Sequence, residues 1–85
     1  MNERKKCEEY GEYIVSDPEI CGGDLTFKGT RIFVKDVLEM VAEGMPWEQI
    51  TETWFGRVSR DAIAEAVALA KAALLEKTAS QRQAA

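Results

Sequence analysis

The amino-acid sequence predicts a mainly α-helical fold in which a short N-terminal β-hairpin precedes three helices, the last two in a helix-turn-helix arrangement. Apolar residues follow a two-residue period between residues 13 and 34, among turn-forming glycines, and then recur with a helical period from Lys35 onward. The second and third helical segments are separated by a break of only four residues, Phe55–Val58. A break of this length is typical of a helix-turn-helix, in which the third helix would be the recognition helix.

The hairpin is expected within residues 13–34. Tyr13–Val15 is a short run of strand-favouring residues, while Leu25–Phe27 and Arg31–Val34 are two further runs on either side of a turn. Gly29 lies in that turn and is free to adopt a positive φ.

A two-stranded sheet is marginally stable alone, and an exposed strand edge invites pairing with another chain. We therefore expect the hairpin region to pair within a homodimer or with another protein, with Tyr13 and Phe33 as candidate contacts.

The first helix is expected to begin at Lys35, with Asp36 near the free amide groups of its first turn, and to end at Gly44. Pro46 suits the first position of the second helix. Trp47 and Trp54 are seven residues apart on one face of that helix. Packing in the core is the favoured interpretation of these two side chains, and a groove for a partner is the alternative.

The third helix is expected to begin after Ser59, a good N-cap residue, and to continue through an alanine-rich segment to about Lys77. The sequence thus divides into a charged, partly disordered lead-in at residues 1–12, a single domain at residues 13–77 and a frayed tail at residues 78–85. Within the domain, the hairpin occupies residues 13–34 and the helices residues 35–77.

The net charge and the lack of a long apolar run limit the classes of function that the chain can have. The 85 residues carry 11 basic and 15 acidic side chains, for a net charge of −4, and the acid excess lies mostly in residues 1–20. A pI near 4.8 argues against strong non-specific affinity for DNA, although it leaves open weak specific binding by a dimer or with a basic partner. A charged N-terminus and the lack of a long apolar run favour a soluble, cytoplasmic protein.

No catalytic or metal-binding constellation is evident. The chain has no histidine, and its two cysteines, Cys7 and Cys21, lie far apart in the sequence. Without an imidazole base, neither the serines nor the cysteines have the partner that nucleophilic catalysis needs. A structural zinc site takes about four nitrogen or sulfur ligands, so we expect no bound metal, and we expect no other cofactor. We also expect two reduced thiols rather than a disulfide, and no enzymatic activity.

Arg57, Ser59 and Arg60 are the candidate DNA-binding residues. They lie at the expected start of the third helix, where a helix-turn-helix contacts base edges and phosphates. Asp61 follows at once, and its charge would repel phosphate. The alternative interpretation is that the three residues only cap and solubilise the helix.

Two motifs resemble a known family. The runs Asp17–Gly23 (DPEICGG) and Lys28–Ile32 (KGTRI) are similar to those of the bacterial domain of unknown function 433 family, and the resemblance covers residues 13–75. Many family members have proline where this chain has Phe33, and a helix-capping serine where it has Lys35. Because lysine does not replace that serine, the resemblance implies that Asp36 caps the helix here. The resemblance implies a homeodomain-like helix-turn-helix. The motif residues proposed for family-specific or partner contacts are Asp17, Pro18, Gly22, Gly23, Lys28, Gly29, Thr30 and Arg31.

The resemblance also suggests a function. Family members are often encoded beside small PIN-like nuclease toxins and are regarded as antitoxins of VapB type. The leading hypothesis is therefore a dimeric regulatory protein that binds a toxin-like partner first and its own promoter DNA second. The acid excess fits a basic partner. The alternatives are an interaction adaptor without DNA affinity and a structural subunit of a larger assembly.

Overall fold

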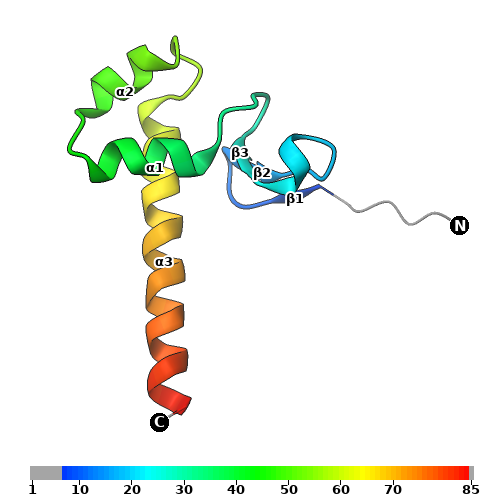
Figure 1. Cartoon of the computed structure of the whole chain (residues 1–85), viewed down its shortest axis with the longest axis vertical. Helices are drawn as coiled ribbons and strands as arrows, with labels where there is room; N and C mark the ends of the chain where they lie inside the picture. Colours follow the sequence, from blue (N-terminus) through cyan, green and yellow to red (C-terminus); the bar gives the residue numbers. More distant parts are fainter. Residues whose placement is uncertain (1–6, 85) are drawn as a thin grey trace, which may run out of the picture.

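The computed structural model describes residues 7–84, in which a three-stranded antiparallel sheet precedes three helices (Figure 1). The mainly α-helical class with a short β region at its N-terminal side is confirmed. The strands are β1 (Glu8–Glu9), β2 (Ile14–Ser16) and β3 (Leu25–Phe27), and the helices are α1 (Val34–Ala42), α2 (Trp47–Thr53) and α3 (Arg60–Ala84). Helix α1 lies across α3, while the sheet lies beside them (Figure 1).

Strand β2 is the centre of the sheet. It pairs with β1 on one side and with β3 on the other, and Ile14 lies opposite Phe27. The prediction of a strand at Arg31–Val34 was wrong, since this segment has only an isolated bridge between Phe33 and Thr26. The cause is a tight turn, in which the Thr30 hydroxyl donates to the Phe27 carbonyl at 2.8 Å.

The charged lead-in contributes to the sheet. Residues 1–12 were expected to be partly disordered, yet Glu8–Glu9 forms the edge strand β1, with Glu9 opposite Val15. Residues 1–6 lie outside the described part of the chain. The pairing was not evident from the sequence because neither glutamate is buried and a solvated two-residue strand has no alternating apolar pattern.

The core lies where α1, α2 and α3 meet β2 and β3. Its buried side chains are Ile14, Phe27, Val34, Val37, Ile50, Val58, Ala62, Ile63 and Ala66. Trp47 and Trp54 are half-buried against this cluster, so the interpretation of their spacing as core packing is confirmed. Among the fully buried residues, Val37, Ile50, Val58 and Ile63 come from α1, α2, the turn and α3, respectively. The helix-turn-helix is therefore anchored on both sides of its turn.

Helix α1 begins one residue earlier than expected. Val34 is already helical, and Phe33 occupies the N-cap position without a side-chain hydrogen bond. The expected capping by Asp36 was therefore wrong, because this carboxylate lies inside the first turn and acts only on the helix dipole. The end at Gly44 is confirmed, since Gly44 has a φ of 87° and its amide donates to the Val41 carbonyl at 3.0 Å.

The other two helices differ from expectation at their ends. Pro46 is the N-cap of α2 rather than its first helical residue. Helix α3 continues to Ala84, so the tail expected to fray from residue 78 is helical as far as the structure describes it. Alanine, glutamine and arginine in this segment are good helix formers, which explains the extension. None of the described helices is long and apolar enough to cross a membrane.

Helix α3 extends far beyond the rest of the molecule (Figure 1). Its 25 residues span about 37 Å at the usual helical rise. Every side chain from 68 to 77 is exposed, including Leu74 and Leu75 at 63% and 57%. We call residues 68–79 of α3 the stalk. The stalk therefore extends from the rest of the molecule with exposed apolar side chains.

Candidate functional site

The turn between α2 and α3 presents an exposed aromatic side chain on a strained backbone. Phe55 has a φ of 56°, in the left-handed region that bulky residues rarely adopt, and its side chain is 88% exposed. The conformation is held by backbone hydrogen bonds from Phe55 to Glu52 at 3.1 Å and from Gly56 to Thr51 at 2.8 Å. Phe55 thus gains nothing from burial within this chain, and its position is set by the helix-ending turn.

The start of α3 is capped as the sequence predicts. The Ser59 hydroxyl oxygen accepts a hydrogen bond from the Ala62 amide at 3.1 Å. Val58, just before it, is fully buried and fixes the turn against the core. Ser59 is exposed, so its hydroxyl can contact an outside group only in addition to its capping role.

The two arginines of the turn differ in their electrostatic surroundings. Arg60 forms an exposed ion pair with Glu48 of α2 at 3.5 Å, and Asp61 follows it in the first turn of α3. Arg57 is exposed and takes part in none of the ion pairs found among the described residues. Of the predicted DNA-binding residues, Arg57 is therefore the one whose charge is least offset.

The first motif shapes a loop. The Asp17 carboxylate accepts from the Glu19 amide at 2.9 Å, and the Asp17 carbonyl accepts from the Ile20 amide at 2.9 Å. These bonds define a turn around Pro18, whose ring fixes φ at a suitable value. Asp17 and Pro18, expected to contact a partner, thus have a clear role in the local fold.

The glycines of the same motif continue this loop through a short 3-10 turn at Cys21–Gly23. Cys21, Gly22 and Gly23 all have positive φ, at 54°, 68° and 91°. The Ser16 hydroxyl donates to the Gly23 carbonyl at 2.6 Å, which ties the loop back to β2. Gly22 and Gly23 therefore permit the backbone conformation, as their lack of a side chain indicates.

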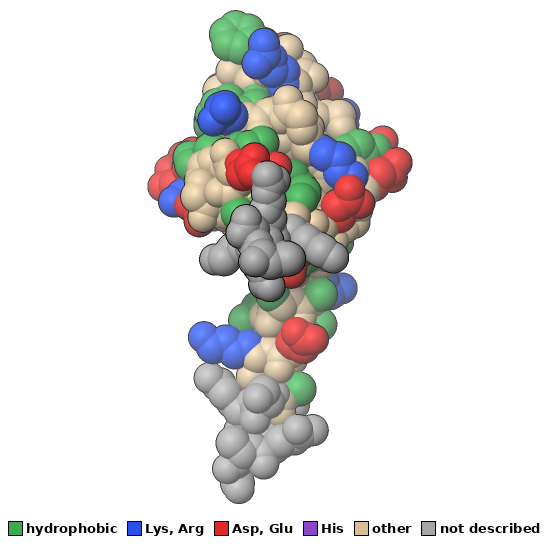
Figure 2. Space-filling view, turned by 90° about the vertical axis from the view of Figure 1, so that its right-hand side faces the viewer, with side chains coloured by type: hydrophobic (Ala, Val, Ile, Leu, Met, Phe, Trp, Pro, Cys, Tyr) green, Lys and Arg blue, Asp and Glu red, His purple; other side chains and the backbone are tan. Residues whose placement is uncertain are grey.

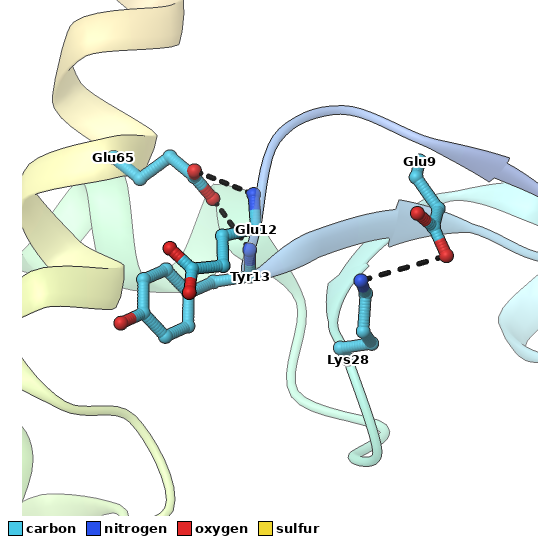
Figure 3. A network of polar contacts seen from close by, with 5 residues as sticks. All are labelled: Glu9, Glu12, Tyr13, Lys28 and Glu65. Atoms are coloured by element: carbon cyan, nitrogen blue, oxygen red, sulfur yellow. Dashed lines mark hydrogen bonds and ion pairs between the residues drawn. The ribbon is translucent and has the colours of Figure 1, made fainter.

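The second motif is also locally engaged, except for its arginine. Lys28 forms an ion pair with Glu9 of β1 at 3.5 Å (Figure 3). Gly29 has a φ of 78°, and the Thr30 oxygen accepts from the Ile32 amide at 3.0 Å. Arg31 is exposed and has no ion-pair partner among residues 7–79.

These separate features meet in one hollow. Its lining residues are Ile20, Gly29, Thr30, Arg31 and Arg57. The first comes from the DPEICGG motif, the next three from KGTRI and the last from the helix-turn-helix turn. We call this feature the arginine hollow. The sequence indicated Arg31 and Arg57 separately but gave no sign that the fold brings them to one place.

The comparison with known proteins matches residues 14–70 to a family described as Protein of unknown function (DUF433). This match covers more than half of the chain. The chain belongs to the DUF433 family. Neither the curated proteins nor the solved structures yielded a match. The matched DUF433 region spans β2 to the first part of α3, so it contains the arginine hollow and excludes β1 and most of the stalk.

On another side of the DUF433 domain, α3 holds the sheet through a carboxylate. The Glu65 side chain accepts hydrogen bonds from the Glu12 and Tyr13 amides, both at 2.7 Å (Figure 3). The pKa of the Tyr13 hydroxyl is raised, mainly by the negative charge of Glu12 and next by partial desolvation. The charges of Asp61 and Glu65 raise it further. This side of α3 is thus acidic, in contrast to the arginine hollow, where no carboxylate lines the hollow within the described part of the chain.

The two aromatic residues expected at a dimer contact have partners within the chain. Tyr13 is half-buried against the core, and Phe33 is half-buried with the Lys35 ammonium group 5.0 Å from its ring centroid. Cation–π contact of this kind adds modest stability at an exposed site. Both side chains remain partly exposed, and their contact with a second chain stays a prediction.

Charge and thiol chemistry complete the description of this DUF433 member. On the face shown in Figure 2, Lys and Arg side chains lie among Asp and Glu side chains, without a broad basic patch. Cys7 and Cys21 are both free thiols. Among the described residues, no three His, Cys, Asp or Glu side chains are grouped so that they could hold a metal ion.

Proposed function

We propose that this DUF433 protein is a small regulatory binding protein of the antitoxin-like kind. It binds a toxin-like protein partner and, through the α2–turn–α3 unit, DNA of its own promoter. The observation that carries the proposal is the helix-turn-helix turn itself, in which Phe55 is 88% exposed and Arg57 is free of ion pairs within the described residues. The protein works by binding and has no catalytic activity of its own.

The protein partner is expected at the turn. Aromatic side chains dominate the binding energy of many interfaces, and strained backbone conformations cluster at functional positions. Phe55 combines both features, because it is exposed and has a positive φ. The net charge of −4 favours association with a basic partner, such as a PIN-like nuclease.

DNA contact is the weaker of the two activities. The ion pair between Arg60 and Glu48, with Asp61 beside it, offsets part of the positive charge at the start of α3. A few phosphate contacts give modest, salt-sensitive affinity. Two DNA-reading units in a homodimer, or a basic partner bound to each, would raise that affinity. In this proposal the protein is a cytoplasmic homodimer, and Leu74 and Leu75 on the stalk, exposed by 63% and 57%, are candidates for the contact between the two chains.

Co-expression with the product of the neighbouring gene tests the protein-binding part. We expect a stable complex on size-exclusion chromatography and suppression of the partner's nuclease activity. Phe55→Ala should weaken the complex, whereas Tyr10→Ala, which removes an exposed aromatic side chain outside the turn, should leave it unchanged. A partner that elutes separately from the wild-type chain, with its nuclease activity unaffected, would contradict the antitoxin-like function.

The second candidate function is a protein-interaction adaptor without DNA affinity, and the third is a structural subunit of a larger assembly. The offset charge of Arg60 favours the adaptor. An adaptor would form the same complex with its partner but would leave upstream DNA unbound at low salt. Binding to DNA by the chain or by its complex therefore separates the adaptor from the regulator.

A further inference from the structure

Within the described part of this acidic protein, two arginines have no carboxylate partner and line the same hollow. Three cations of the body form ion pairs, namely Lys28 with Glu9, Lys35 with Asp24 and Arg60 with Glu48. Arg31 and Arg57 are in no ion pair of the described residues, although the chain has 15 acidic side chains to offer. Both line the arginine hollow.

The hollow is built by segments that the fold holds in place. Arg57 is adjacent to Val58, which is fully buried. Arg31 follows a turn that the Thr30 side chain closes with hydrogen bonds of 2.8 Å and 3.0 Å. A Cβ at Gly29 would meet no atom within 4 Å, so this rim is open to solvent. Both guanidinium groups thus extend from ordered backbone at an open surface.

Two like charges at one hollow, with no carboxylate among the described residues that line it, favour binding of an anion. The guanidinium fork matches the oxygens of phosphate and binds them with two parallel hydrogen bonds. We propose that Arg31 and Arg57 hold a single phosphate group of a DNA backbone in this hollow. This inference rests on the proposed DNA binding and assigns to the KGTRI motif a part in it.

The position of the hollow explains what such a contact would achieve. Arg57 lies three residues before α3, the recognition helix of a helix-turn-helix. Phosphate contacts fix the register and orientation of a protein on the duplex, while base contacts specify the sequence. One phosphate held by the motif and the turn together would therefore align the start of α3 with the major groove.

Titration with inorganic phosphate, followed by NMR, tests the anion site independently of DNA. We expect saturable shifts at the Gly29 and Arg31 amides and at the Arg57 side chain. Arg31→Ala and Arg57→Ala should each abolish saturation, whereas Lys71→Ala, which removes an exposed cation of the stalk, should leave it intact. Acetate should cause weaker shifts than phosphate. Absence of saturation, survival of saturation in Arg31→Ala, or shifts from acetate as large as those from phosphate would overturn the assignment.

The salt dependence of binding to upstream DNA tests whether both arginines hold the same phosphate. The slope of log K against log salt is negative, and its magnitude falls by about 0.9 for each DNA phosphate that the protein no longer neutralises. With one shared phosphate, the slope falls by about 0.9 in the Arg31→Ala, Arg57→Ala double variant and by less in each single variant. Independent phosphates would instead lower the slope by about 0.9 in each single variant and by about 1.8 in the double variant.

The outcomes separate this inference from the proposed function. If wild-type protein binds DNA and Arg31→Ala binds it with the same affinity and slope, the shared phosphate is refuted and the DNA-binding function stands. If neither the wild-type chain nor its complex binds DNA, the proposed DNA binding fails and the DNA source of the phosphate fails with it. Saturable binding of inorganic phosphate would in that case still assign the hollow to a phosphate group.

Discussion

Replacing Phe55 by glycine should stabilise the protein while weakening its binding to a partner. The left-handed conformation costs a non-glycine residue about 1–2 kcal/mol. Glycine avoids this cost but loses about 0.4–1 kcal/mol through the greater freedom of the unfolded chain. Because the Phe55 side chain is 88% exposed, almost no burial is lost. We expect a gain of about 0.5–1 kcal/mol in the free energy of unfolding, which raises Tm by roughly 2–8 °C for a domain of this size.

Phe55→Ala is the matched control. It removes the same aromatic ring but keeps a Cβ, so the backbone strain at a φ of 56° persists. Urea unfolding should therefore place Phe55→Ala within about 0.5 kcal/mol of the wild type, as for most exposed substitutions. Both variants should bind the partner less tightly, as measured by calorimetry. Equal stability of the Gly and Ala variants would refute the argument from backbone strain.

Three further predictions concern a carboxylate, a helix cap and a thiol. Glu65→Ala removes two hydrogen bonds of 2.7 Å to backbone amides and should cost about 1–3 kcal/mol in urea unfolding; a loss below about 0.5 kcal/mol would mean that water replaces them fully. Ser59→Ala should cost about 1 kcal/mol and Ser59→Asp very little, whereas equal losses would refute the cap. Partial desolvation, followed by the negative charges of Asp17 and Glu9, raises the pKa of the Cys7 thiol. Asp17→Asn should therefore shift the pH midpoint of Cys7 alkylation downward, and an unchanged midpoint would contradict this electrostatic effect.

The elements that sequence patterns predicted best are those with local causes. Gly44 ends α1 and Ser59 caps α3 because each acts on the backbone within a few residues. The seven-residue spacing of Trp47 and Trp54 likewise placed both against the core. The family motifs were recognisable, and the match at residues 14–70 confirms the family they indicated.

The elements that were missed depend on residues distant in the sequence. The Glu65 carboxylate binds amides more than 50 residues away, and a lone glutamate on a helix gives no sign of such an interaction. Likewise, Arg31 and Arg57 are 26 residues apart and meet only in the fold. Tertiary packing decided each of these features.

The central claim, regulation through the helix-turn-helix turn, is tested most directly by fluorescence anisotropy of labelled upstream DNA at low salt. The complex with the neighbouring-gene product should be compared with the same complex carrying Arg57→Ala and Arg60→Ala. We predict that the wild-type complex binds, and that the double variant binds more weakly with a flatter salt dependence. Unchanged affinity and salt slope in the variant, or no binding by the wild-type complex, would contradict the claim.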